Sequence, residues 1–268
     1  MPFTLSHPSI VVPLYFIRKK YFSLTGLIIG SMIPDIKFFT SVYIIRNFSH
    51  NWEKAYWLGL PISLLLCFVF HNVIREPLIH YSPSAIGNRF SRYERFNWNR
   101  YFLNNWLIII LSILIGIYSH LMLDGFTHLS FNMLSSLTGF STEIVPENED
   151  LIYYRIIQSL YSLAGLVAEI YIIGKLPVDS IRKPKTNITG YWSTIVCLSL
   201  IFYVSFGAQD FEVIEEFIGF AIAAIFLALF FTSILYRIVI KKFRTRSAEI
   251  SKMKMPATSK VSQISKKR

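Results

Sequence analysis

The residues best suited to carry out chemistry lie in one short stretch, Ser119–His128, where a histidine and an aspartate stand four positions apart at His120 and Asp124. On a helix, positions i and i+4 share one face. An imidazole and a carboxylate on one face can bind a divalent cation such as zinc, and His128 can join if the helix continues or turns back. The alternative is a histidine–aspartate hydrogen bond near a helix end. Ionisable residues inside an apolar segment are usually functional, which favours the metal site.

The remainder of the chain surrounds these residues with apolar sequence. Of the 268 residues, 53% are hydrophobic and 16% are charged, whereas a soluble domain carries about 25% charged residues. This composition excludes a soluble or disordered chain and predicts an integral membrane protein. The segment Lys241–Arg268 contains ten basic residues and one acid, nearly the whole net charge of +11. We therefore expect a single helical membrane domain over 1–240 and a disordered basic tail over 241–268.

The basic tail also predicts the partners of the protein. A cationic segment directly after an apolar helix is attracted to anionic lipid headgroups on the cytoplasmic face of a membrane. The expected partner is therefore the lipid bilayer, with the tail on its headgroups, and no nucleic acid is expected.

Hydropathy predicts an all-α, polytopic transmembrane helical bundle of about six membrane segments. A crossing needs about 20 apolar residues. The predicted crossings are Tyr21–Ile45, Ala55–Ile74, Trp106–Leu123, Ile156–Gly174, Ile188–Ala208 and Phe217–Tyr236. The first is interrupted by Pro34 and Asp35, so we expect a broken helix packed inside the bundle. Gly26 and Gly30, four positions apart, predict a close helix–helix contact.

Depth along the predicted helices brings a second carboxylate to the level of His120. His120 follows Trp106 by fourteen positions, and Asp35 follows Tyr21 by fourteen. At about 1.5 Å per residue, each lies about 21 Å above the inner edge of the bilayer, in its outer half. Asp35 and His120 are therefore expected to be level.

The break at Pro34 turns the Asp35 carboxylate away from a regular helix face, as a residue lining a cavity requires. The alternative for Asp35 is a turn carboxylate paired with Lys37. His50 follows the outer end of this broken helix and precedes the next crossing. It is therefore a candidate third or fourth metal ligand at the same interface.

Loop charges predict the orientation, because cytoplasmic loops are enriched in lysine and arginine. The stretches 75–105 and 175–187 are basic, as is the C-terminal tail, whereas 143–150 and 210–216 are acidic. The basic stretches are expected to face the cytoplasm. Six crossings then place both termini in the cytoplasm, with Arg18–Lys20 on the same side.

Several blocks of the first half of the chain resemble a bacterial family, domain of unknown function 4184. They are Met1–Pro8 (MPFTLSHP), Gly30–Asp35 (GSMIPD), Ser49-His50 leading to Leu60-Pro61, Phe70-His71, and Ser119–His128 (SHLMLDGFTH). The Gly-to-Pro-Asp and Ser-His-to-Asp blocks are also similar, more distantly, to predicted membrane-bound metal-dependent hydrolases typified by the LexA-regulated inner-membrane protein.

The resemblance implies a multi-pass protein of the bacterial cytoplasmic membrane whose histidines and aspartates gather around a metal ion. The residues it implies are His7, Asp35, His50, His120, Asp124 and His128. One departure concerns Ile45, which stands where the hydrolase-like group tends to have a second histidine. The spacing from His120 to His128 is also similar to the helix signature of zinc-dependent phospholipase C and related nucleases, which implies phosphoester substrates.

His7 raises a conflict about the N-terminus. The cationic Arg18–Lys20 predict an N-terminus inside the cell, whereas a site shared with His120 and Asp124 requires His7 in the outer half of the bilayer. The first segment must then re-enter the bundle, or the predicted topology of the N-terminus is wrong. The alternative for His7 is the start of an interfacial helix capped by Ser6.

Three hypotheses about function follow. The first is a metal-dependent hydrolase in which His120, Asp124, Asp35 and His50 hold a divalent cation, expected to be zinc. Water is then the nucleophile, Asp35 or Asp124 the catalytic base, and a lipid-linked phosphoester the substrate class. The second is an ion or small-solute transporter, because a broken helix with a buried carboxylate also describes an ion site. The third is a noncatalytic membrane scaffold.

Overall fold

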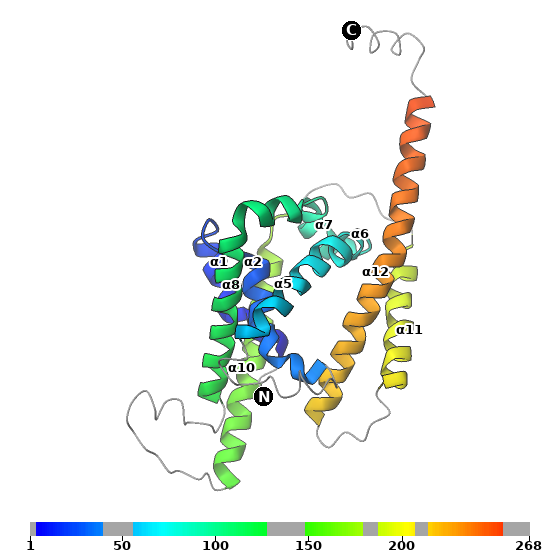
Figure 1. The fold of residues 1–268 in the computed structure, drawn as a ribbon. Helices are drawn as coiled ribbons and strands as arrows, with labels where there is room; N and C mark the ends of the chain where they lie inside the picture. Colours follow the sequence, from blue (N-terminus) through cyan, green and yellow to red (C-terminus); the bar gives the residue numbers. More distant parts are fainter. Residues whose placement is uncertain (1–3, 40–55, 128–147, 179–186, 207–213, 254–268) are drawn as a thin grey trace.

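The computed structural model describes residues 4–39, 56–127, 148–178, 187–206 and 214–253. Every regular element in these ranges is helical, which confirms the predicted all-α class (Figure 1). The α-helices are α1 (Pro8–Ile17), α2 (Leu24–Met32), α5 (Gly59–Val69), α6 (Arg75–His80), α7 (Ser84–Phe90), α8 (Trp98–Thr127), α10 (Asn148–Lys175), α11 (Ile188–Phe206) and α12 (Ile214–Met253).

Four stretches are long and apolar enough to cross a membrane. They are Gly59–His80, Trp98–Asp124, Ile188–Ser205 and Phe217–Ile238. Each overlaps one of the predicted crossings, so the bundle character and these four segments are confirmed. The chain is therefore a multi-pass helical membrane protein by length and composition of its helices.

The other two predicted crossings are described differently. The segment Ile156–Gly174 lies in α10, which is not among the four stretches, although Leu160, Leu163 and Ile170 on its outer side are 61%, 62% and 70% exposed. Such an apolar outer face is typical of lipid contact. The segment Tyr21–Ile45 contains only a shorter apolar stretch, Leu24–Ile36, and its residues from 40 onward lie outside the described ranges.

Pro34 breaks the first of these helices, as predicted. The α2 helix ends at Met32, and the chain continues as a tighter 3-10 helix over Ile33–Phe39. Proline has no N–H to donate to the carbonyl four residues earlier, so the α-helical ladder cannot continue past this point. Asp35 therefore lies in the first turn of the 3-10 helix, beside the open end of α2.

The N-terminal segment folds as a hairpin of two short helices. The α1 helix begins at Pro8, with His7 as its cap residue, so the predicted cap by Ser6 is wrong by one position. The turn after α1 contains Arg18–Lys20 and lies at the upper left of Figure 1, where a bond from the Tyr21 N–H to the Arg18 carbonyl closes it. His7 and the cationic cluster thus lie at opposite ends of α1.

The two ends of α1 lie at different levels of the bundle, so His7 and the cationic cluster need not share one side, and both predicted solutions for the N-terminus stay open. With ten residues, α1 is about 15 Å long, too short to cross a bilayer. The orientation of both termini relative to the membrane stays a prediction.

The α8 helix buries one stripe and exposes the other. Ile109, Ile113 and Ile117, spaced four apart, have no exposed surface, whereas Leu107 and Leu111 are 53% and 49% exposed. Residues four apart share a face, so this stripe forms the core against α2 and α5. The helix bends at Asn105, whose backbone is not helical. The predicted crossing began at Trp106, directly after this bend.

Close packing between α2 and α8 depends on three glycines. A Cβ added to Gly116 would lie 2.6 Å from the Leu27 carbonyl oxygen, and one added to Gly26 would lie 3.0 Å from the Ile109 carbonyl oxygen. Gly30 likewise meets the backbone of α8 at Ile113. The predicted contact through Gly26 and Gly30 is therefore present, and it brings the two backbones together without intervening side chains.

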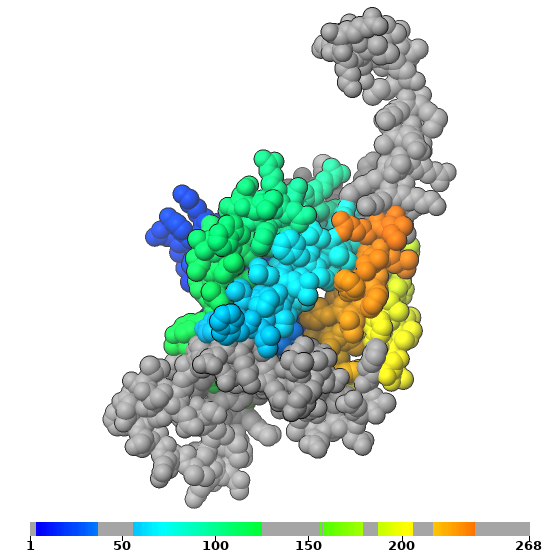
Figure 2. All heavy atoms as spheres, viewed as in Figure 1, coloured from blue at the N-terminus to red at the C-terminus, as the bar shows by residue number. Residues whose placement is uncertain are grey.

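The α11 and α12 helices form a second pair. The α12 helix contacts the rest of the bundle through α6, the π-helical segment Phe70–Ile74 and the 3-10 helix Ile33–Phe39. In Figure 2 the segment that contains α5 and α6 lies between α8 and α12. Ala228 of α12 packs against Tyr191 and Ile195 of α11. Arg237 pairs with Glu76 at 3.7 Å, which ties α12 to α6. The α12 helix continues to Met253, so 241–253 extend it as a helix, and 254–268 lie outside the described residues.

We expect Gly116→Ala to destabilise the protein, because the added methyl meets the rigid backbone of α2. Overpacking of this kind costs about 1–3 kcal/mol, which should lower the thermal unfolding midpoint of the detergent-purified protein. Gly174→Ala is the matched control, since a Cβ there meets nothing within 4 Å. An equal effect of both substitutions would contradict this account of the α2–α8 contact.

Candidate metal centre

His120 is the central residue of the candidate site, and a backbone carbonyl fixes its tautomer. Its Nδ1 lies 2.6 Å from the carbonyl oxygen of Ser31, in the last turn of α2. A carbonyl only accepts, so Nδ1 carries a proton and donates it. This carbonyl is available because the last carbonyls of a helix lack partners within it. Neutral His120 therefore presents its lone pair on Nε2.

Two carboxylates face this Nε2 atom. Asp124 Oδ2, one turn further along α8, is 3.3 Å away, and Asp35 Oδ1 is 3.5 Å away. The depth prediction that Asp35 and His120 are level agrees with this short distance. The other oxygen of Asp35, Oδ2, accepts a hydrogen bond of 2.6 Å from the Thr4 hydroxyl. Thr4 thus orients Asp35 so that Oδ1 is directed to His120.

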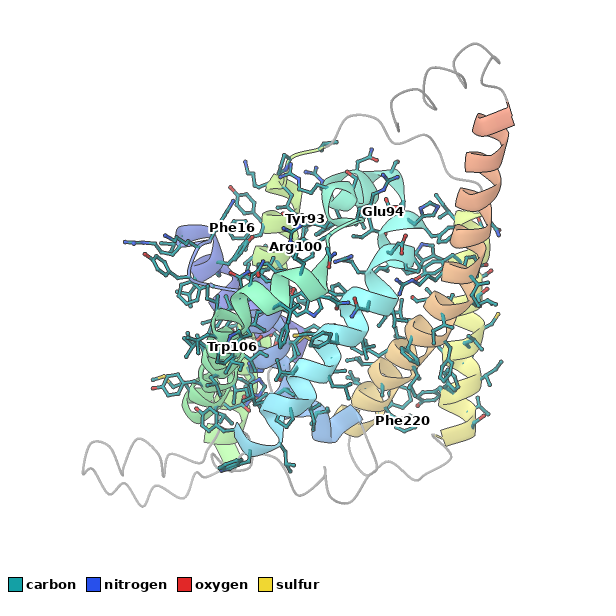
Figure 3. All side chains as sticks on the ribbon, turned by 45° about the horizontal axis from the view of Figure 1, so that its top comes forward. Phe16, Tyr93, Glu94, Arg100, Trp106 and Phe220 are labelled. Carbon is teal, nitrogen blue, oxygen red and sulfur yellow. The ribbon has the colours of Figure 1, made fainter. Side chains whose placement is uncertain are left out.

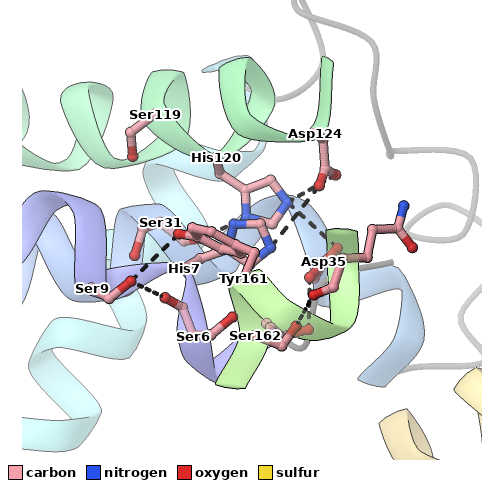
Figure 4. A network of polar contacts seen from close by, with 12 residues as sticks. Ser6, His7, Ser9, Ser31, Asp35, Ser119, His120, Asp124, Tyr161 and Ser162 are labelled. Carbon is pink, nitrogen blue, oxygen red and sulfur yellow. Dashed lines mark hydrogen bonds and ion pairs between the residues drawn. The ribbon is translucent and has the colours of Figure 1, made fainter. Parts of the chain in front are cut away.

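His7 completes the group by stacking on one face of the His120 ring (Figure 4). The two imidazole rings stack with their centroids 3.8 Å apart and an angle of 19° between their planes. His7 Nε2 is 4.0 Å from Asp124 Oδ1. Three elements far apart in the sequence therefore bring two imidazoles and two carboxylates to one point.

The group is buried, which makes its charge balance decisive. His7, Asp35, His120 and Asp124 are 2%, 0%, 1% and 2% exposed. With both histidines neutral, two carboxylates would carry an uncompensated charge of −2, which is very costly away from water. Two stacked imidazolium rings at this separation would repel each other. A proton on one imidazole would leave a net charge of −1, whereas one divalent metal ion would balance both carboxylates.

The available atoms suit a metal ion. His7, His120 and Asp124 each offer one ligand atom, and these atoms all lie within 4.8 Å of one another. Within the described part of the chain, His120 Nε2 and Asp35 Oδ1 have no hydrogen-bond partner despite complete burial. Two histidines and one carboxylate match the ligand set of catalytic zinc sites, which keep a fourth position open. Asp35 lies beside this set rather than in it.

The predicted site residues are therefore accounted for as follows. His7, Asp35, His120 and Asp124 come together, including His7, which only the family resemblance implied. His50 and His128 lie outside the described residues, so their roles stay predictions. The alternative pairing of Asp35 with Lys37 stays a prediction, because the Lys37 side chain lies outside what the structure describes.

Sequence analysis missed two side chains near the site. Thr4, which orients Asp35, belongs to the same opening block as His7, and that proximity was a signal for it. Tyr161 of α10 lies with its ring centroid 6.4 Å from that of His7, and its hydroxyl is 3.4 Å from Ser9 Oγ (Figure 4). A tyrosine in an apolar helix has no pattern that distinguishes it from an interfacial aromatic residue.

Comparison with known proteins gives a family. The family described as Domain of unknown function (DUF4184) matches residues 1–254. The chain belongs to this family. The match to DUF4184 covers every residue of the candidate site, from Thr4 to Tyr161, and confirms the predicted resemblance.

No curated protein matches this DUF4184 chain, and no solved structure matches it. The more distant similarity to membrane-bound metal-dependent hydrolases is therefore still an expectation. What the family description and the helices together establish is a membrane protein of a family without an assigned function.

We expect the detergent-purified protein to contain about one divalent metal ion per chain, measured by elemental mass spectrometry after purification without chelators. His120→Ala and Asp124→Ala should each lose this metal, because three protein ligands are the minimum for a stable catalytic-type site. His80→Gln is the control, since His80 pairs with Glu94 at 3.0 Å in a different cluster. Absence of metal, with no uptake when zinc is added back to folded protein, would contradict the metal site.

Proposed function

We propose that this DUF4184 protein is a membrane-embedded, metal-dependent hydrolase that acts on a lipid-linked phosphoester. The observation that supports it best is the orientation of His120. Its Nδ1 is committed to the Ser31 carbonyl, and its buried Nε2 faces Asp124 and Asp35 without a hydrogen bond in the described part of the chain. Metal-binding histidines are typically fixed in this way by a backbone carbonyl on the other ring nitrogen.

In this proposal His7, His120 and Asp124 hold the metal ion. Imidazole and carboxylate ligands suit zinc, which is the ion we propose. A divalent cation supplies Lewis-acid chemistry, because it acidifies water and polarises a phosphoryl oxygen. The stacked His7 and His120 rings keep one another in place, so both nitrogens are already aligned before the ion binds.

Asp35 is the proposed general base. A base must hold its lone pair toward the proton that it removes, within hydrogen-bond reach. The Thr4 hydroxyl occupies Asp35 Oδ2, which leaves Oδ1 at the site beside His120. Because Asp35 lies beside the three metal ligands and not among them, it can take a proton from water without giving up a metal bond.

The position of the site supports a lipid-linked substrate. It is fully buried among helices whose outer faces are apolar, such as Leu107 and Leu111 of α8. In the proposed orientation, the basic ends of α6, α7 and α12, at the top of Figure 1, face the cytoplasm of a bacterial cell. His120 and Asp124 then lie toward the outer half of the membrane, where a substrate anchored in the bilayer can approach.

One observation also favours an ion transporter. The chain changes from α2 to a 3-10 helix next to a buried carboxylate, and discontinuous helices of this kind form ion sites in transporters. The two functions can be distinguished by what is measured. A hydrolase releases product without a membrane gradient, whereas a transporter moves solute across a sealed vesicle.

Asp35→Asn tests the hydrolase directly, because it should retain the metal but lose the base. We expect the zinc-loaded wild-type protein to hydrolyse a p-nitrophenyl phosphodiester or a short-chain phospholipid. The variant should be slower by about a hundredfold or more, the usual contribution of a general base. Thr4→Val, which releases Asp35 Oδ2, should show a smaller loss.

The measurements are product release in detergent and metal content of the same samples. Metal-loaded wild-type protein without activity toward either substrate class, together with ion or solute flux in proteoliposomes, would replace the hydrolase by the transporter. Equal activity of wild type and Asp35→Asn would show that Asp35 is not the base.

A further inference from the structure

A second buried polar cluster lies where α5 passes into α6. The passage is a π-helical segment, Phe70–Ile74, followed at once by α6. We call the side chains gathered here the Arg75 cluster. Its members are Thr25, His71, Arg75, Phe96 and Trp98. Single π-helical turns inside α-helices occur frequently at functional sites.

Arg75 carries the only charge of this cluster. One of its terminal nitrogens donates to His71 Nδ1 at 2.9 Å, and the other donates to the Phe96 carbonyl at 2.5 Å. Arginine cannot accept a hydrogen bond, so His71 Nδ1 must be the acceptor. His71 is therefore neutral, with its proton on Nε2, from which it donates to the Thr25 hydroxyl at 2.8 Å.

No carboxylate of the described residues pairs with Arg75, although this side chain is only 7% exposed. The two acidic residues nearest in sequence form their ion pairs elsewhere, although the charge of Glu76 also acts on Arg75. Glu76 pairs with Arg237 at 3.7 Å, and Glu94 pairs with His80 at 3.0 Å. A buried cation is normally balanced by an anion, because burying an unpaired charge is costly.

Two buried donors of the cluster also lack acceptors. Among the described residues, neither Arg75 Nε nor Trp98 Nε1 has a hydrogen-bond partner. Trp98 is 2% exposed, and its ring is stacked on His71 with centroids 4.1 Å apart and planes within 7°. The cluster thus combines a guanidinium that forms no ion pair within the described ranges with two buried N–H groups that find no acceptor there.

We propose that the Arg75 cluster binds a phosphate-type oxyanion. Such an anion balances the guanidinium charge and accepts from the N–H groups of Arg75 and Trp98. Arginine is suited to this role, because its planar donors match the oxygens of a phosphate. The same chemistry is presented by a phospholipid headgroup and by free phosphate.

The surroundings of the cluster favour an anion. The segment between α7 and α8 carries Arg92 and Arg95, and Arg100 follows in the first turn of α8. Figure 3 shows Tyr93, Glu94 and Arg100 at this end of the bundle. These cations raise the local concentration of anions. The cluster is separate from the metal centre, because Thr25 lies in the first turn of α2 and Ser31 in its last turn, about 9 Å apart along the helix. The proposal does not depend on the proposed hydrolase.

Binding can be measured by isothermal titration of the full-length protein in a neutral detergent. The probes are inorganic phosphate, dihexanoyl phosphatidylglycerol, and a short-chain diacylglycerol that lacks phosphate. We expect saturable binding of a phosphate-bearing probe and none of diacylglycerol. Saturation by free phosphate identifies a soluble anion as sufficient, whereas saturation by the lipid alone identifies a headgroup.

Arg75→Gln should weaken this binding at least tenfold, since it removes a charge-assisted donor. Trp98→Phe, which keeps the stacking ring and removes only the N–H, should weaken it about fivefold and remains informative if Arg75→Gln fails to fold. Arg89→Gln is the control, because Arg89 donates to the Gly174 and Leu176 carbonyls instead.

Three results would overturn the proposal. These are no binding of either phosphate-bearing probe by the wild type, equal binding by wild type and Trp98→Phe, or equal losses in Arg75→Gln and Arg89→Gln. The last result would show general surface attraction between a basic protein and an anion.

Discussion

Where Gly116 of α8 meets Leu27 and Ser31 of α2, two helix backbones come into contact without side chains between them. The candidate site depends on this contact, because His120 lies one turn beyond Gly116. Only at this separation can its Nδ1 reach the carbonyl of Ser31. That carbonyl is available in turn because Pro34 stops α2 shortly afterwards. A close contact and a helix break, neither of them chemically reactive, therefore fix the most reactive atom of the site.

The two buried clusters solve the problem of charge inside an apolar bundle in opposite ways. Around His120, two negative carboxylates face imidazoles that are neutral unless protonated, so positive charge is needed there. Around Arg75, a guanidinium donates to neutral acceptors, and we propose that an anion binds there. In both clusters a hydrogen bond defines the tautomer of a histidine. The protein thus has an electropositive and an electronegative buried group on the two halves of one short helix, α2.

Sequence reasoning located the fold class and much of the site because periodicity and spacing carry that information. Four apolar segments, the break at Pro34 and the pair of Gly26 and Gly30 were predicted from local sequence. The approach of Asp35 to His120 followed from counting residues along two helices. Such arithmetic works where helices are regular and cross together.

It failed where contacts depend on three-dimensional packing. The α1 helix is too short to be predicted as a crossing, so the sequence left open how His7 reaches the site. Thr4 and Tyr161 have no periodic pattern that marks them as site residues. Arg75 belongs to a basic stretch that was expected to face the cytoplasm, and loop charge did not predict that its side chain is buried. Its position follows from a local widening of the helix, which no residue type in Phe70–Ile74 dictates.

The short first helix has a consequence for how the protein is made. The α1 helix is synthesised before α8 and α10, yet it is about half as long as a bilayer core is thick and cannot anchor itself there. Its partners come much later, since Ser9 meets Tyr161 across 152 positions of chain. During synthesis, His7 must therefore wait outside its final place until α8 and α10 have been inserted. The four-residue group can therefore be completed only after α8 has been inserted, and an ion bound there would hold the segment around His7 to α8.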